Sequence, residues 1–199
     1  MKIIGVDPGF AHLGFAAVEL HHPAGADLLD VLLIETKPSA KKQRLAVADD
    51  ESRRLSDIED AAILFLDKHQ PELVVIEDPP WGKNAKAVRV CALMWGALHG
   101  ICRARGVFVL NIGAQLIKKV VAGKNTASKE DVYAAVKATF PHFKGWPQKA
   151  AVEHVADAVG AALAIRKHPL VISLANGTAM RLHAERTRGP ADRRTTTAT

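Results

Sequence analysis

Four side chains with acid–base and metal-binding chemistry occupy positions where strand ends and one helix can bring them together. Asp7 ends an apolar run and precedes Pro8-Gly9, and Glu77 ends the β-branched run LVVIE. His154 and Asp157 are three residues apart in an expected helix, so they share one face. In open α/β sheets, active sites form beyond the carboxyl ends of strands. The four residues are therefore our candidate catalytic and metal-binding set.

Phosphodiester hydrolysis would give this set a chemical purpose. Two Mg²⁺ ions ~3.5–4 Å apart can activate the attacking water and stabilise the leaving 3′ oxygen, and Mg²⁺ prefers hard oxygen ligands. On this hypothesis Asp7 bridges the two ions of the active site, Glu77 binds one ion and Asp157 binds the other. A neutral His154 either ligates a metal or accepts a proton from the attacking water.

Each of these residues also has an ordinary structural explanation. Asp-Pro-Gly is a common turn sequence, so Asp7 alone would more often be structural. Glu77 can simply end a strand or cap a helix, His154 can be a surface histidine, and Asp157 can pair with a lysine. Only their combination, in this order and on these elements, favours a metal site.

The apolar periodicity predicts the elements that must position the set. We expect a mixed sheet flanked by helices, the α/β class, with an antiparallel meander of the first three strands. Ser128 followed by Asp131 resembles a capping box that starts one of the helices. The expected strands are 2–7, 12–20, 28–36, 73–77 and 107–110, and the expected helices are 49–69, 85–105, 112–121, 128–140 and 150–168.

The overall composition indicates one folded domain with a polyanionic partner. The chain has 199 residues, is 48% hydrophobic and carries a formal net charge of +6, which favours nucleic acid over an acidic membrane surface. We expect a domain over residues 1–168 and a basic extension over 169–199 whose end is disordered. Cys91 and Cys102 lie about three turns apart in one expected helix, too far to form a disulfide.

The N-terminal sequence MKIIGVDPG reads as a strand that enters a turn, and it lacks the layout of a signal peptide. No stretch approaches the ~18 apolar residues of a membrane span. We therefore expect no membrane partner and a cytoplasmic location, in a bacterial nucleoid or in the cytoplasm of a phage-infected host.

Four sequence blocks, in family order over residues 1–168, resemble the RuvC Holliday junction resolvases of the RNase H-like superfamily. They are IIGVDPGFAHLGFA, LVVIEDPPWGKNAKAV, GAQLIKKVVAGKNTASKEDV and HVADAVGAALAIRKH. The resemblance implies an RNase H-like five-stranded mixed sheet flanked by helices. It places Asp7 and Glu77 at the first two family acids, and it identifies His154 and Asp157 as a family variant of the final pair.

The resemblance also implies the substrate and partners. It implies a homodimer that holds a four-way DNA junction and nicks two strands symmetrically with Mg²⁺, for which Mn²⁺ can substitute. Lys118 and Lys129 match lysines that contact phosphates in the family, although each alone would be read as part of a solvated helix face. A branch-migration motor is a further candidate partner.

The segment after the second acid departs from the family pattern. Pro79-Pro80-Trp81 stands where the family carries an aromatic wedge, so Trp81 either stacks at the junction centre or packs in the core or at its rim. The Lys83-Asn84 pair matches the family, and Lys83 is a further candidate DNA contact.

The long expected helix 85–105 carries a broad apolar stripe that suits either core packing or a partner helix. The predicted stripe contains Val88, Ala92, Trp95, Leu98 and Cys102, widened by Leu93, Ala97 and Ile101. The family resemblance favours the partner helix of a twofold dimer, which also matches a roughly twofold substrate.

Three competing functions follow from the same residues. A related nuclease would cut other branched nucleic acid, such as flaps, forks or structured RNA. A catalytically inactive module would bind DNA with the same fold, although all four candidate ligands are present. Actin-like sugar kinases share the Asp-x-Gly turn after a first strand, but they need two such domains and a much longer chain.

Overall fold

The structure is a computed structural model that describes residues 1–21, 25–40, 46–78, 85–148 and 152–175. It divides into two compact units, Met1–Ala164 and Ile165–Thr199. The first unit contains all five strands and five helices among its described residues. Its elements in chain order are β1 (Lys2–Asp7), β2 (His12–Leu20), β3 (Ala26–Glu35), α1 (Val47–His69), β4 (Leu73–Glu77), α2 (Ala85–Ala104), β5 (Phe108–Ile112), α3 (Ala114–Ala122), α4 (Lys129–Thr139) and α5 (Val152–Ala164).

The five strands form the predicted mixed sheet, in the order β3-β2-β1-β4-β5. β1 pairs antiparallel with β2, which pairs antiparallel with β3, so the predicted meander is confirmed. β4 runs parallel to both β1 and β5. Because Val6 is paired with Ile76, the carboxyl ends of β1 and β4 lie side by side at one edge of the sheet.

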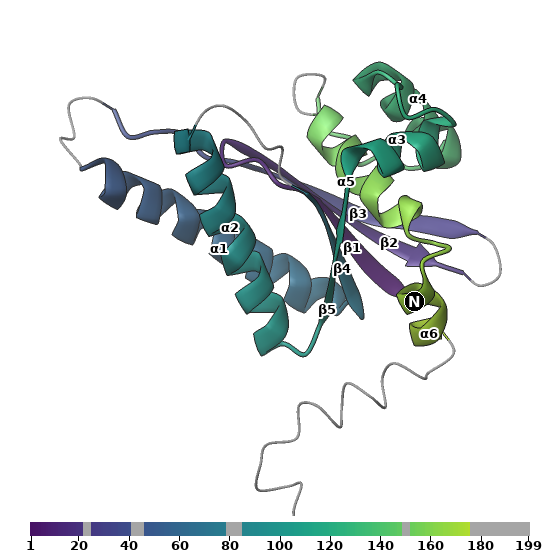
Figure 1. Cartoon of the computed structure of the whole chain (residues 1–199), viewed down its shortest axis with the longest axis horizontal. Helices are drawn as coiled ribbons and strands as arrows, with labels where there is room; N and C mark the ends of the chain where they lie inside the picture. The colour runs from purple at the N-terminus through teal and green to yellow at the C-terminus, as the bar shows by residue number, and fades with distance from the viewer. Residues whose placement is uncertain (22–24, 41–45, 79–84, 149–151, 176–199) are drawn as a thin grey trace, which may run out of the picture. The chain divides into compact units, whose positions relative to one another are not determined.

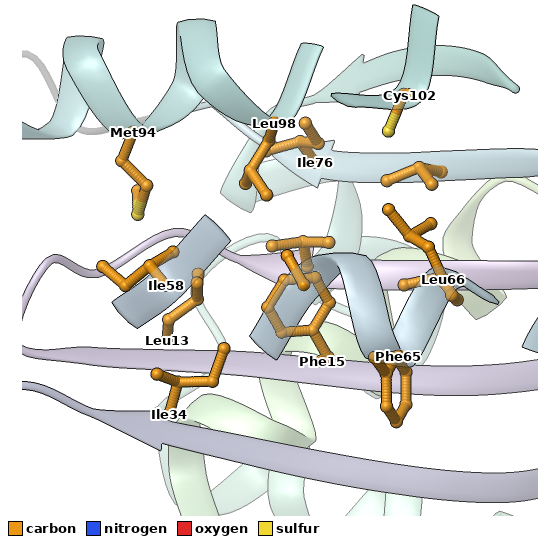
Figure 2. Packing of buried hydrophobic residues seen from close by; sticks show 14 of the residues in the cluster. Leu13, Phe15, Ile34, Ile58, Phe65, Leu66, Ile76, Met94, Leu98 and Cys102 are labelled. Atoms are coloured by element: carbon orange, nitrogen blue, oxygen red, sulfur yellow. The ribbon is translucent and has the colours of Figure 1, made fainter. Parts of the chain in front are cut away.

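Helices cover both faces of this sheet, with α1 and α2 on one face and α3, α4 and α5 on the other (Figure 1). The core on the first face is built by alternate strand residues, because successive side chains of a strand point to opposite faces. Figure 2 shows strand residues Phe15 and Ile76 between Phe65 of α1 and Leu98 of α2. Each such buried side chain contributes roughly 1.5–3 kcal/mol relative to its exposed state.

On the second face, α5 approaches the sheet as closely as backbone permits. A Cβ added to Gly5 of β1 would lie 1.9 Å from the Ala158 carbonyl oxygen, and one added to Gly14 of β2 would lie 2.2 Å from that of His154. The helix matches these glycines with small residues, since Ala158 and Ala162 are fully buried. This contact fixes the depth at which α5 presents its polar residues to the ends of β1 and β4.

The ends of several elements differ from the prediction. β5 runs over Phe108–Ile112 rather than 107–110, and the last predicted helix ends at Ala164 instead of continuing to 168. In the second unit, Pro169 begins α6 (Pro169–Ala175), a helix at the start of the stretch predicted only as a basic extension. Proline suits the first helical position, because the backbone N–H that it lacks would have no intrahelical partner there.

The rotation of α2 also corrects the predicted apolar stripe. Its fully buried residues are Val90, Met94, Leu98 and Cys102, whereas Ala92 is exposed and Val88 is only half-buried. The core contact therefore uses a face rotated from the predicted one. Cys91 and Cys102 are both free thiols, as predicted.

In the ranges that the structure describes, no single helix is long and apolar enough to cross a membrane. A bent pair, α5 with α6, reaches that length and composition only when its two members are taken together.

Candidate active site

The sheet brings Asp7 and Glu77 to the same face and the same edge. Gly5 faces α5, so Asp7, two residues further along β1, faces α5 as well. Val75 of β4 is paired with Gly5, and Glu77 follows two residues later. Strand alternation and parallel register therefore place the first two predicted acids next to each other beneath α5.

Helix α5 places the His154 side chain in direct contact with Asp7. The His154 Nδ1 atom donates a hydrogen bond to Asp7 Oδ2 at 2.7 Å, and the two side chains are only 22% and 17% exposed. This hydrogen bond raises the pKa of His154 against the opposing effect of burial. The imidazole is thus held in a charge-stabilised contact with the strand carboxylate.

Glu77 and Asp157 complete a cluster in which negative charge is poorly compensated. Burial, together with the charges of Asp7 and Asp157, raises the pKa of Glu77 to about 8. Burial and Asp7 together raise the pKa of Asp157 to about 6. Mutually raised acid pKa values are typical of carboxylates that share one site, and such sites are frequently functional.

Two predicted DNA-binding lysines border this cluster. The charges of Lys129, at the start of α4, and of Lys118, on α3, both lower the pKa of Glu77. Lys129 Nζ lies 3.3 Å from Glu153 Oε2, and this ion pair, with the charges of Asp157 and Asp7, raises the lysine pKa although burial opposes it. The Ser128–Asp131 capping box forms as predicted and fixes the start of α4 beside the acids.

Glu153 and His12 were not predicted, yet both lie against His154. Glu153 Oε1 is 3.9 Å from His154 Nε2, and the His12 ring is stacked on the His154 ring with centroids 5.4 Å apart. Glu153 could have been suspected, because it directly precedes His154 and belongs to the same helical turn. His12 carries no such signal, since its contact depends on how α5 crosses β2.

A buried arginine fixes the segment that follows Asp7. Arg54 of α1 donates from Nε to Thr36 Oγ1 at 3.0 Å and from a terminal nitrogen to the Phe10 carbonyl oxygen at 3.3 Å. Its guanidinium also lies 4.4 Å from the centroid of the Phe10 ring. The turn between β1 and β2 is therefore attached to α1 and to the end of β3, which limits the movement of Asp7.

The donor set suits a hard divalent cation in its chemistry. Asp7, Glu77 and Asp157 offer carboxylate oxygens, the ligand type that Mg²⁺ and Mn²⁺ prefer, and His154 adds an imidazole nitrogen beside them. Among the described residues, no three His, Cys, Asp or Glu side chains already stand at the spacing of a complete ligand set. Ion binding would thus require rotation of acid side chains within the cluster.

Two predicted DNA-binding residues, Trp81 and Lys83, lie outside the described residues, as does the arginine-rich stretch 176–199. The structure therefore gives no position for the predicted aromatic wedge or for the arginine-rich part of the predicted basic extension.

Comparison with known proteins agrees with this arrangement. The family model for crossover junction endodeoxyribonuclease RuvC matches residues 3–166. The crossover junction endodeoxyribonuclease RuvC of Salinibacter ruber is 31% identical over 149 residues, which cover 71% of this chain and 78% of the relative. The corresponding protein of Campylobacter lari is 33% identical over 138 residues, covering 69% and 80%.

Solved structures give the same result for the fold. Thermus thermophilus RuvC matches with a TM-score of 0.68 and 26% identity, covering 89% of this chain and 98% of that one. The yeast mitochondrial Holliday junction resolvase Ydc2 shares the fold alone, with a TM-score of 0.61 at 12% identity over 90% of this chain and 83% of that one. By its sequence match over almost the whole first unit, and with the predicted acids converging as described, the chain belongs to the RuvC family of crossover junction endodeoxyribonucleases.

Proposed function

We propose that this protein resolves four-way DNA junctions by paired, magnesium-dependent nicks made by a homodimer. The observation that carries the proposal is the convergence of Asp7, Glu77, His154 and Asp157 at one edge of the sheet. The family supports the substrate, since its relatives are crossover junction endodeoxyribonucleases. The net charge of +6 suits a DNA partner.

Asp7, Glu77 and Asp157 would hold the magnesium, with His154 as a fourth ligand or as a proton acceptor. When bound, the metal would stabilise the negative charge that develops on the phosphate and lower the pKa of a bound water. Burial and neighbouring acids raise the pKa values of Glu77 and Asp157, and Lys118 and Lys129 offset the rise for Glu77 only in part, so a bound divalent cation would favour the charged carboxylates. His154 holds a proton at Nδ1 toward Asp7, so it can exchange protons at the site.

The two lysines would bind the DNA backbone at the border of the acid cluster. Lys129 is half-exposed, and its ion pair with Glu153 is of the surface kind that contributes little to stability. A phosphate can therefore replace the Glu153 contact at small cost. Lys118 lies on the neighbouring helix α3, and its positive charge lowers the pKa of Glu77. Together the two lysines would position the scissile strand beside the acids.

The outer face of α2 would form the dimer contact. Leu93 is 47% exposed there, and Gly96 and Gly100, one turn apart, would each have no atom within 4 Å of an added Cβ. A helix face with two glycines at its centre lets a second helix approach closely, and a twofold dimer presents two equal sites to a roughly twofold substrate. This face lies to one side of the buried stripe of α2, which contains Val90, Met94, Leu98 and Cys102.

A substrate panel tests the proposal. We expect a synthetic four-way junction to be cut with paired nicks in the presence of Mg²⁺, in preference to a fork, a flap and a linear duplex. Asp7→Asn should abolish nicking and leave junction binding largely intact, because the substitution removes a ligand charge without changing the side-chain shape.

The panel also separates the alternatives. Preferred cutting of flaps or forks would assign the same site to other branched DNA, and equal cutting of duplex and junction would indicate a general nuclease. Junction binding without any cutting would indicate an inactive DNA-binding module. Retained nicking by Asp7→Asn would exclude Asp7 as a metal ligand.

A further inference from the structure

His12 touches the candidate active site from the sheet side. It begins β2, its side chain is 46% exposed, and its ring lies nearly parallel to the ring of His154, with an interplanar angle of 9°. The centroid separation of 5.4 Å is within the range of stacked rings. His12 therefore covers one face of the imidazole whose edge contacts Asp7.

The backbone holds His12 in this place. His12 is two residues before Gly14, so the two share a face of β2. Gly14 is paired with Asp7, and a Cβ added to it would contact the carbonyl oxygen of His154. The stack between His12 and His154 thus follows from the same close approach of α5 that assembles the acids.

A carboxylate on the next strand anchors the His12 ring. His12 and Glu35 are direct partners across β2 and β3, and His12 Nε2 lies 3.5 Å from Glu35 Oε1. The contacts therefore run from Glu35 to His12, through the ring stack to His154, and through Nδ1 to Asp7.

We propose that His12 is a positioning residue of the nuclease, whose ring holds the His154 imidazole in the orientation that directs Nδ1 toward Asp7. This inference rests on the proposed function for its consequence in catalysis. A histidine ring has a broad torsional preference about its second side-chain bond, and one hydrogen bond does not fix the plane of the ring. The parallel face of His12 supplies that second constraint.

The test compares a variant that loses the aromatic ring at position 12 with a variant that keeps a ring there. His12→Ala removes the stack, whereas His12→Phe keeps a flat ring and removes only the nitrogens. His21→Ala is the matched control, because His21 lies beyond the other end of β2, is 47% exposed and pairs with Asp27 at 2.8 Å, far along the strand from the acids. The variants change exposed side chains, and thermal unfolding checks that each is folded.

The first readout needs neither metal nor DNA. In nitrogen-15 NMR spectra of the imidazole rings, His154 should show one protonation pattern with a slowly exchanging Nδ1 proton in the wild type, His12→Phe and His21→Ala. In His12→Ala that proton should exchange faster and its signal should broaden. The second readout is Mn²⁺ affinity by electron paramagnetic resonance, which should fall roughly two- to tenfold in His12→Ala, the size of one aromatic contact.

On a four-way junction, His12→Ala should lower kcat by a similar factor with KM nearly unchanged, and His12→Phe should restore most of the rate. Identical His154 spectra in His12→Ala and the wild type would overturn the inference. So would a His12→Phe protein as impaired as His12→Ala, since the ring plane would then not matter. A wild-type protein that does not cut junctions would refute the proposed function instead, and the metal-free NMR comparison would still decide the role of His12.

Discussion

At the scale of single residues, the site is defined by charge that the protein leaves uncompensated. Three carboxylates and an imidazole lie together, and two of the half-buried acids, Glu77 and Asp157, have raised pKa values. The nearby cations, Lys118 and Lys129, offset this charge only in part. Such a cluster stores electrostatic repulsion that a divalent cation would relieve.

The raised pKa values of these two acids predict how the stability of the protein depends on pH. The pKa values of Asp157 and Glu77 rise to about 6 and about 8 in the folded protein, above their ordinary values of 3.8 and 4.5. Between pH 4 and 8 the folded state therefore binds more protons than the unfolded state, and the free energy of unfolding falls as pH rises. Without metal, we expect Tm to be lower at pH 8 than at pH 5.5 by roughly 2–8 °C.

Glu77→Gln should flatten the upper part of this pH profile, between pH 6 and 8, and Mg²⁺ added at pH 8 should raise the Tm of the wild type more than that of the variant. Differential scanning calorimetry with and without chelator measures both effects. A metal-free profile that rises steadily from pH 5.5 to 8 would show that the pKa values of these acids are not raised in the folded protein.

The lysines predict how DNA binding depends on salt. Lys118→Ala and Lys129→Ala should each reduce the slope of log affinity against log salt by about one unit, because each would release about one counterion fewer. Lys68→Ala is the matched control, since Lys68 lies on α1, on the opposite face of the sheet, and pairs with Asp30 at 2.7 Å. Binding of Asp7→Asn protein to a junction in a salt titration gives the slopes. An unchanged slope for Lys129→Ala would remove that lysine from the phosphate contacts.

At the scale of elements, the site depends on how closely α5 lies on β1 and β2. Small residues make this possible, because Gly5 and Gly14 leave room for helix backbone where any side chain would collide. Arg54 adds a second fixed point by attaching the turn after Asp7 to α1. The acids are thus carried by the rigid parts of the fold, as a preorganised site requires.

Gly14→Ala tests this close approach. The added methyl would lie 2.2 Å from the His154 carbonyl oxygen, so α5 must move, and we expect a loss of about 1–3 kcal/mol in the free energy of unfolding. The displaced helix should also lower nuclease activity, because His154 and Asp157 move with it. Urea denaturation measures the stability change.

Gly113→Ala is the control, since Gly113 has open space at its Cβ and extended backbone angles that alanine adopts freely. It precedes α3, so its cost should stay below about 1 kcal/mol. Equal stability of Gly14→Ala and Gly113→Ala would mean that α5 does not press on β2 in solution.

Much of this arrangement could be predicted from sequence, because strands and their ends have local signals. Asp7 and Glu77 end β-branched or apolar runs that are followed by prolines in the sequence, and their register follows from parallel pairing. His154 and Asp157 share a helix face by spacing alone. The contact between His12 and His154 could not be predicted, because it depends on the crossing of α5 over β2. The rotation of α2 was also predicted wrongly, because the side that it buries depends on how it packs against α1 and β5.

At the scale of the whole molecule, one protomer carries one acid cluster, whereas resolving a four-way junction requires two coordinated cuts. The proposed dimer would use the outer face of α2, where Leu93 is 47% exposed and Gly96 and Gly100 have open space. A twofold axis through this face would relate two identical sites, so symmetry of the protein would match symmetry of the substrate.

Leu93→Glu tests the dimer. A buried, unpaired carboxylate at the contact should shift the protein to monomers in sedimentation velocity, and junction cleavage should change from paired to single nicks or be lost. Leu64→Glu on α1 is the control, because Leu64 is 70% exposed and lies on a helix that takes no part in the proposed contact. A monomeric wild type, or a Leu93→Glu protein that stays dimeric, would exclude this face as the contact.

The most direct test of the central claim is the position of bound metal. A crystal of the wild-type protein soaked with Mn²⁺ should show anomalous density bounded by the carboxylates of Asp7, Glu77 and Asp157, and this density should disappear in Asp7→Asn. Density at a site away from these residues in a protein that still cuts junctions would contradict the account.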